Sequence, residues 1–303
     1  IIRQQKKIFI ISIIVVIVGA TSIAIFKINP GVDFTSGSRI EIVTDEPISS
    51  EQIEEDFSSI NLEPKSIVLS GENNEGAVTR FDTVLTEQQM IDVRQYFSEK
   101  YNHEPNVSIV SPIVGQELVK NAIYAVLISL IGLIIYVTFR FELFFSFTAI
   151  VALTFDVFFA LVVFSITRLE FDITIIAALL TIIGYSLNNT IVVFDRIREN
   201  IRKKNKLITS KKELAKIINN SLIQTFIRNI NTTTTTLVVV FAFMILGAQS
   251  IFGFAIAIVV GLIAGTYSSL FLASQLWLVW RGKDLKKRPL DFRKKKRVEG
   301  PQV

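Results

Sequence analysis

The sequence contains no cysteine and a single histidine, His103, among its 303 residues. Without cysteine the chain forms no disulfide and offers no thiolate to a metal, and cysteine usage says nothing about its redox compartment. One histidine excludes any site that needs several imidazoles. A glycine-rich phosphate loop, a nucleophile–base pair and a metal-ligand cluster are also missing from the sequence. We therefore expect no enzyme active site, no metal centre and no bound cofactor.

What the sequence does contain is apolar residues, which make up 50% of the chain. This share is typical of a polytopic membrane protein. Six apolar runs predict membrane helices, at residues 8–26, 118–139, 143–166, 173–194, 231–246 and 252–280. The first run is long for a signal peptide and is followed by no small-residue cleavage pattern, so we interpret it as a span.

The charges between these runs predict the orientation of the chain. Residues 27–117 carry 6 Lys and Arg against 17 Asp and Glu, whereas residues 195–228 carry 10 against 3, and the tail from Arg281 also carries 10 against 3. Basic residues beside spans mark the cytoplasmic side. We expect both termini in the cytoplasm and the acidic region outside. The basic residues then indicate contact with anionic lipid, not with nucleic acid.

The predicted fold is an α-helical polytopic membrane protein with six transmembrane helices and an extracytoplasmic α+β ferredoxin-like domain between spans one and two. Its expected parts, in chain order, are the cytoplasmic N-terminus with the first span, the outer domain, spans two to four, a cytoplasmic basic segment with one or two interfacial helices, spans five and six joined by an outer turn at 247–250, and a basic tail that is disordered at its end. These parts cover residues 1–26, 27–117, 118–194, 195–230, 231–280 and 281–303.

The acidic region has the pattern of a split βαβ domain. Strands are expected at 39–43, 66–69, 77–85 and 107–110, and helices at 49–60 and 87–101, with Ser49 and Thr86 as N-caps. The order β-α-β-β-α-β places two helices on one face of a four-stranded sheet.

Polar residues inside the spans are the candidate functional groups. Asp156 lies near the middle of the third span, where a charged side chain costs about 2.5–3.5 kcal/mol and has to face a partner or a cavity. We expect a functional role for it, and a buried structural hydrogen bond is the alternative. In the fourth span Tyr185 shares a stripe with Asn188 or Asn189. The amides are equally consistent with hydrogen bonds between helices and with a transport role. Small residues from Gly261 to Ser269 predict tight packing of the sixth span.

Residues 184–200, Gly-Tyr-Ser-Leu-Asn-Asn-Thr-Ile-Val-Val-Phe-Asp-Arg-Ile-Arg-Glu-Asn, resemble the fourth-span signature of SecF proteins in the SecD/SecF family of protein-export subunits, which belongs to the RND superfamily. The signature includes Asp195, Arg196 and Arg198. The family usually has Asp at the position of Asn189, and that Asp is taken to carry the transported proton or sodium ion. The resemblance extends over nearly the whole chain.

Further motifs add to the resemblance. Gly31-Val32-Asp33-Phe34-Thr35-Ser36-Gly37 is similar to the family motif after the first span, with Ser36 in place of the first glycine of a pair. By itself this motif is explained by a tight turn that Asp33 caps. Residues 154–157 resemble the His-Asp-Val region of the third span, with Phe155 in place of histidine. Arg228 stands where SecF proteins carry an arginine implicated in ion coupling, although an ordinary positive anchor explains it equally well.

The resemblance implies an export subunit of the bacterial or archaeal plasma membrane that pairs with SecD, and with a SecY-type channel. H⁺ or Na⁺ flow through the paired bundles then assists the exported polypeptide. Asn189 leaves three explanations open, since an amide does not titrate near neutral pH. The first is that the chain is an engineered Asp→Asn variant. The second is that Asp156 or a carboxylate of SecD carries the ion instead, and the third is that the chain has lost ion coupling. An RND-type small-molecule exporter and a purely structural or chaperone-like subunit are the alternative functions.

Overall fold

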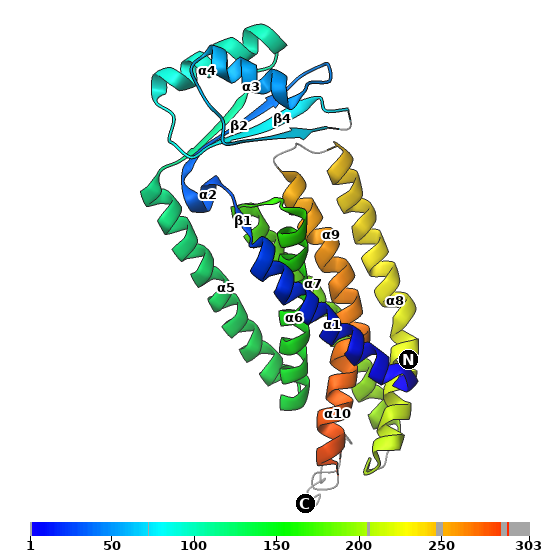
Figure 1. Ribbon diagram of the computed structural model, residues 1–303. Coiled ribbons are helices and arrows are strands. Elements are labelled where there is room, and N and C mark those ends of the chain that lie inside the picture. Colours follow the sequence, from blue (N-terminus) through cyan, green and yellow to red (C-terminus); the bar gives the residue numbers. More distant parts are fainter. Residues whose placement is uncertain (1, 72, 205–206, 247–250, 286–289, 291–303) are drawn as a thin grey trace, which may run out of the picture.

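The computed structural model describes residues 2–71, 73–204, 207–246, 251–285 and 290, which form a bundle of long helices with a small α+β domain at one end (Figure 1). Six helices are long and apolar enough to cross a membrane, as predicted. We call the end of the bundle beside the α+β domain the domain end. The opposite end, where the sixth span stops, is the tail end.

The spans are bounded as follows. They are η1 with α1 (Ile2–Gln4 and Gln5–Phe26), α5 (Pro112–Arg140), α6 (Leu143–Thr167), α7 (Ile173–Lys203), α8 (Lys211–Leu246), and a sixth made of α9 (Phe252–Tyr267), the π-helical η3 (Ser268–Ala273) and α10 (Ser274–Asp284). About half of the apolar stretch is buried in α6, α7 and the sixth span (50%, 50% and 56%), against 17%, 11% and 17% in α1, α5 and α8. The centre of the bundle is therefore α6, α7 and the sixth span.

Several predicted boundaries differ from the structure. The second span begins at Pro112, not at residue 118, because the hydroxyl of Ser111 accepts a hydrogen bond from the amide of Val114 (3.4 Å) and proline suits the first helical position. In the described part of 195–230 there is no separate interfacial helix, since α7 continues to Lys203 and α8 begins at Lys211. The turn expected at 247–250 and most of the expected disordered tail lie outside the described residues.

The α+β domain has the predicted split βαβ topology. It contains β2 (Gly37–Val43), α3 (Ser50–Ser59), β3 (Ser66–Ser70), β4 (Gly76–Phe81), α4 (Glu87–Tyr101) and β5 (Asn106–Val110). The strands form an antiparallel sheet in the order β3-β4-β2-β5. Both helices lie on the face of the sheet that points away from the bundle (Figure 1).

The local signals explain these elements. Ser49 caps α3, and Thr86 forms a capping box with Gln89 at the start of α4. Strand β4 ends at Phe81, four residues before the predicted end, because Phe81 already pairs with Ser38 and its partner strand β2 begins at Gly37. Beyond it, the amide of Leu85 donates to the side chain of Ser38 (2.9 Å).

A short connection that was not predicted attaches the domain to the bundle. It consists of β1 (Asn29–Pro30), which pairs in parallel with β6 (Glu170–Phe171), and one helical turn, α2 (Val32–Thr35). The β1–β6 pair joins the end of the first span to the segment between α6 and α7. This connection places the sheet directly above the domain end of α7 (Figure 1).

Candidate ion-coupling site

Asp156 is fully buried at the centre of the bundle. One carboxylate oxygen, Oδ2, accepts hydrogen bonds from the hydroxyl of Ser186 on α7 (2.5 Å) and from the hydroxyl of Ser268 in η3 (2.9 Å). The other oxygen, Oδ1, is buried and has no hydrogen-bond partner among the described residues. No described Lys, Arg or His side chain forms an ion pair with this carboxylate.

Close helix packing brings the two serines to Asp156. A Cβ atom added to Gly261 would lie 2.2 Å from Cγ1 of Ile182, so α7 and α9 approach at a distance that only glycine permits. One turn further along, Ser186 faces Gly265. The serine at the end of this contact, Ser268, reaches the carboxylate.

The π-helical turn of the sixth span lies at the same level. It begins at Ser268, and its second residue, Ser269, exchanges a hydrogen bond with Thr190 (2.9 Å) and donates to the backbone oxygen of Ser186 (3.2 Å). Such turns occur mostly as local widenings of α-helices at functional sites. Two consecutive serines of one helix thereby bond to α6 and α7 together.

Sequence reasoning identified Asp156 but not its partners. The small residues of the sixth span predicted close packing, which is present, but not a hydrogen bond from Ser268. Ser186 lies inside the family signature, and its position one turn before Asn189 is the only signal that could have pointed to it.

The structure distinguishes the two adjacent amides of α7. Asn189 is buried, and its Nδ2 has no hydrogen-bond partner among the described residues, whereas Asn188 is exposed. Neither amide hydrogen-bonds to Asp156. Tyr185 accepts a weak hydrogen bond from Thr236 of α8 (3.4 Å), so its ring faces the interface between α7 and α8.

Arg228 lies on the exposed side of α8 and lines a cavity of about 360 Å³ together with Asp195, Arg196 and Glu199 of α7. Asp156 does not line this cavity. The structure thus groups Arg228 with the charged end of the signature and not with the buried carboxylate.

The charged end of the signature holds helices together at the tail end. Asp195 accepts two hydrogen bonds from Arg140 at the end of α5 (3.1 and 3.2 Å). Arg196 donates to Gln224 of α8 (2.7 Å) and pairs with Glu199 (2.6 Å). Arg198 is partly buried beside them and is also engaged in contacts. These residues have structural roles in this conformation.

Asp33 caps a different element from the one predicted. Its Oδ2 accepts a hydrogen bond from the amide of Ile173, the first residue of α7 (3.0 Å), and not from its own turn. Asp172 accepts from the next two amides, of Thr174 and Ile175 (2.8 and 3.2 Å). The base of the domain is therefore bound to the helix that carries Ser186.

Gly37 confirms the need for glycine at the start of β2. Its φ is +131°, and a Cβ atom would lie 2.2 Å from the backbone oxygen of Phe81. Two arginines of the sheet strengthen the same junction. Arg80 donates to the backbone oxygen of Pro30 (2.8 Å), and Arg39 lies 4.0 Å from Asp172.

A metal site is not formed by the described residues, which contain no group of three or more His, Cys, Asp and Glu side chains placed to hold one. Among the described spans, the fully buried carboxylate that could bind a proton or a small cation is that of Asp156, with the hydroxyls of Ser186 and Ser268 beside it. The two serine hydroxyls hold the Asp156 carboxyl group through Oδ2 and leave its Oδ1 without a hydrogen bond among the described residues.

Comparisons with known proteins place the chain in a family. Residues 92–283 match the family described as protein export membrane protein SecD/SecF, C-terminal, and residues 21–48 match the SecD/SecF GG motif. The chain is 34% identical to the protein translocase subunit SecF of Alicyclobacillus acidocaldarius over 95% of this chain and 94% of that protein. It is 49% identical to the subunit SecDF of Bacillus subtilis over 94% of this chain, and spans 38% of that longer protein.

Two solved structures are similar as well. A SecDF crystal structure from Thermus thermophilus matches with a TM-score of 0.81 at 30% identity, over 92% of this chain and 38% of that chain. A SecDF described as being in a super-membrane-facing form matches with a TM-score of 0.64 at 29% identity, over 93% of this chain and 39% of that one. Given the family matches and the near-complete alignment to SecF subunits, this multi-pass membrane protein belongs to the SecD/SecF family of protein-export membrane proteins, as a SecF subunit of the protein translocase.

Proposed function

We propose that this subunit uses a transmembrane ion gradient, together with SecD, to assist polypeptide export, and that Asp156 is its ion-binding group. The observation that carries the proposal is a fully buried carboxylate with two hydroxyl donors, no ion pair among the described residues and one unpartnered oxygen. The coupling ion is H⁺ or Na⁺.

The argument rests on the energy of a buried charge. An unpaired carboxylate at the middle of a span costs about 2.5–3.5 kcal/mol on insertion scales. Two hydroxyl donors reduce this cost but do not neutralise the charge. Asp156 is therefore stable in this packing when it holds a proton or a small cation, and the unpartnered Oδ1 is available for either. Loss of the ion favours a packing that exposes the carboxylate to water.

Asn189 is compatible with this assignment. An amide neither binds nor releases a proton near neutral pH, so the carrier has to be another group. Asp156 is the one carboxylate that is fully buried within the described spans. A carboxylate on SecD is the alternative carrier.

The connection of α7 to the domain offers a route from the ion to movement. Ser186 binds Asp156 from α7, and the first amide of α7 is held by Asp33 of the domain base. A shift of α7 would pull on this junction. The two SecDF structures differ in their similarity to this chain, with TM-scores of 0.81 and 0.64 at nearly equal identity and coverage, which supports alternative arrangements of such parts.

The available energy is sufficient for such a change. One charge moving through 100 mV releases about 2.3 kcal/mol, which shifts a two-state equilibrium more than tenfold. We further propose that the domain faces outward from the plasma membrane and that both termini are cytoplasmic. In this orientation the outer domain meets the polypeptide that leaves a SecY-type channel.

The test is protein export into reconstituted vesicles that contain this subunit, SecD and the translocon, with and without an imposed ion gradient. We expect Asp156→Asn to abolish most of the gradient-dependent export and to leave gradient-independent export unchanged. Asp284→Asn, at the tail end, is the control and should behave as the unmodified chain.

Two other outcomes assign the function differently. Unchanged gradient dependence in Asp156→Asn would move the carrier to SecD. Export that ignores the gradient in all variants would favour a structural or chaperone-like subunit, the alternative that Asn189 permits. A small-molecule exporter would work without SecD. Gradient-driven transport of small molecules by vesicles that contain this subunit, but neither SecD nor the translocon, would therefore support that alternative.

A further inference from the structure

A basic cavity lies at the tail end between α7 and α8. It has a volume of about 570 Å³ and is lined by Lys204, Ser210, Lys212, Lys216 and Asn220, with Glu213 as the acidic residue of the lining. A second cavity of about 260 Å³ adjoins it and adds Lys203 and Asn200. The two share Lys204, Ile217 and Asn220, so they lie side by side.

The charge of this surface is only partly compensated by neighbouring carboxylates. Lys203 pairs with Glu199 (2.8 Å), and Glu213 is engaged in a contact of its own. Lys204, Lys212 and Lys216 form no ion pair with a described carboxylate. The cavity also opens beside the first turn of α8, where the helix dipole favours negative charge. An anion is the ligand that these groups favour.

The same face of α8 becomes apolar immediately beyond the cavity. Lys212, Lys216 and Asn220 are spaced by four residues and share one side of the helix. Ile223, Ile227 and Ile230 continue that side toward the domain end, and they are 58%, 69% and 37% exposed. With a rise of about 1.5 Å per residue, Ile223 lies about 10 Å above Lys216. An anionic headgroup with acyl chains matches this order of charged and apolar side chains.

The start of α8 is held in place. Ile208 pairs with Leu290 through two backbone hydrogen bonds (3.2 Å each) and is fully buried. The stem of Lys211 packs against Gly282 of α10, where an added Cβ atom would lie 3.1 Å from its Cγ. The lysines of the cavity therefore extend from a fixed helix end.

We propose that this cavity binds the phosphate of an anionic phospholipid, with the acyl chains lying along Ile223 and Ile227 of α8. Lys212 and Lys216 contact the headgroup, and Lys204 covers it from α7. Free phosphate shares the chemistry of the headgroup but has no acyl chains to contact Ile223 and Ile227. The lipid site is independent of the ion-coupling proposal, since none of its residues touches Asp156.

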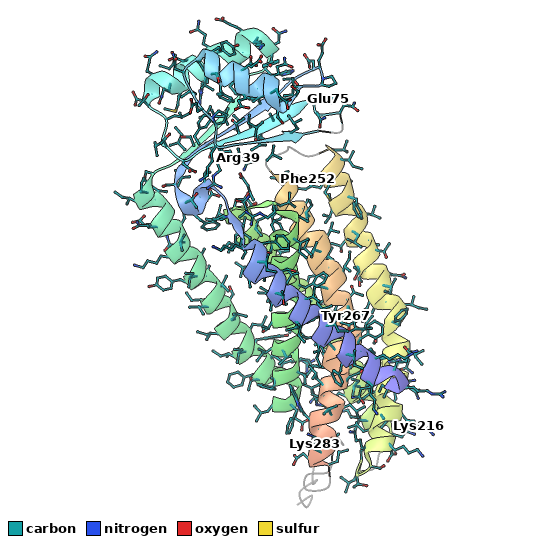
Figure 2. All side chains as sticks on the ribbon, in the orientation of Figure 1. Arg39, Glu75, Lys216, Phe252, Tyr267 and Lys283 are labelled. Carbon is teal, nitrogen blue, oxygen red and sulfur yellow. The ribbon has the colours of Figure 1, made fainter. Side chains whose placement is uncertain are left out.

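The experiment measures lipid binding to the full chain in neutral detergent by native mass spectrometry. Phosphatidylglycerol and phosphatidylcholine are titrated against the unmodified chain and the double variant Lys212→Gln/Lys216→Gln. The matched control is Lys6→Gln/Lys283→Gln, which removes the same charge at the same end, where Lys283 lies on α10 apart from Lys216 (Figure 2).

We expect the cavity variant to bind phosphatidylglycerol roughly tenfold more weakly, since each lysine near an anionic headgroup contributes several-fold. The control should keep the affinity of the unmodified chain, and phosphatidylcholine should bind all three weakly. Ile223→Ser/Ile227→Ser should also weaken phosphatidylglycerol binding. Inorganic phosphate at millimolar concentration should not displace the lipid.

Equal phosphatidylglycerol affinity of the cavity variant and the control would overturn the proposal. Displacement by inorganic phosphate, with no effect of the isoleucine changes, would make the cavity a site for free anions and overturn the lipid assignment. Size-exclusion elution checks the fold of each variant, and the single variant Lys216→Gln replaces the double variant if the latter aggregates.

Discussion

At the scale of single residues, the two neighbouring amides of α7 have different surroundings although the sequence treats them alike. Asn189 is buried with its Nδ2 unpartnered, and Asn188 is exposed. A buried amide donor without a partner is a cost that the packing tolerates, typically about 1–3 kcal/mol. The hydrogen-bonding capacity of asparagine is thus not fully used at position 189, and aspartate, which has a similar shape, can be tested there.

We expect Asn189→Asp to raise gradient-dependent export in the reconstituted vesicles, because it adds a titratable group at a buried position near the Asp156 site. The same change should destabilise the bundle by about 3 kcal/mol when the carboxylate is charged. Asn188→Asp is the matched control, since its side chain is exposed. No gain in ion-dependent export by Asn189→Asp would show that residue 189 does not limit coupling.

A site residue could be predicted from the sequence when its residue type alone was unusual for its place, and not when its role depended on how the helices cross. Asp156 was identified because a carboxylate inside a span is unusual by composition alone. Ser186 and Ser268 were missed because serine in a membrane helix is common and usually bonds to its own backbone, as Ser274 does to Leu270 (3.0 Å). The crossing of the helices in three dimensions shows that these two serines reach Asp156.

At the scale of elements, the contact between α7 and α9 depends on a missing side chain. A Cβ atom at Gly261 would overlap Ile182, whereas one at Gly184 of α7 would meet nothing within 4 Å. The crossing distance also sets the reach of Ser186 and Ser268 to Asp156. Packing and the ion site are therefore coupled through one glycine.

Gly261→Ala should lower the stability of the bundle by about 1–3 kcal/mol, because the added methyl group forces α7 and α9 apart. Gly184→Ala should be neutral or stabilising by up to about 1 kcal/mol, since alanine favours the helix. Thermal unfolding of both variants in detergent checks the difference. Equal stability of the two would contradict the close crossing.

The two helices of the domain are joined by a buried polar cluster. Asp56 of α3 accepts hydrogen bonds from Tyr96, Lys100 and Tyr101 of α4. Burial and the hydrogen bond to Asp56 raise the pKa of Tyr101 to about 12. Because the folded domain holds this proton more tightly than the unfolded chain, the resulting stability is complete below pH 10 and is lost as the pH rises toward 12.

An alkaline titration of the full chain, followed by tyrosinate absorbance, should therefore contain a late-ionising tyrosine. Tyr101→Phe should remove this step, and Asp56→Asn should shift it to lower pH, because the hydrogen bond to a charged acceptor is lost. Tyr124→Phe on α5 serves as the control. A late step that survives Tyr101→Phe would assign the raised pKa to another residue.

The regular elements were predictable because their signals are local. Ser49 and Thr86 cap the helices that directly follow them, and the apolar residues Ile40 and Ile42 alternate with polar residues along β2. The β1–β6 pair and α2 were not predictable, since two residues carry no periodicity and their partners lie far away in the sequence. The same reason explains why Asp33 was assigned to its own turn.

At the scale of the whole molecule, the domain and the bundle meet through few but specific contacts. Asp33, Arg39 and Arg80 bind the segments that flank the start of α7, and Arg39 lies on the side of the sheet that faces the bundle (Figure 2). The resemblance predicted a junction motif, but its physical content, a cap on a distant helix, appears only in three dimensions.

We expect Asp33→Ala to reduce gradient-dependent export while spans and domain stay folded, because the link between α7 and the domain base is weakened. Loss of an N-cap bond costs about 1 kcal/mol, which is small relative to the whole bundle. Asp45→Ala, which removes an exposed carboxylate of the domain, is the control. Full gradient dependence in Asp33→Ala would exclude this junction as the route of transmission.

The pairing of Asn29 with Glu170 and of Pro30 with Phe171 has a consequence for biogenesis. The four-stranded sheet uses residues 37–110, so its strands are all synthesised before the second crossing is finished. Part of its attachment, however, waits for residues 170–173, which leave the ribosome after two more crossings. A nascent chain halted before that point already has the contact of Arg80 with Pro30 but lacks those of β6 and Ile173, so the domain completes its attachment only after the third span has been synthesised.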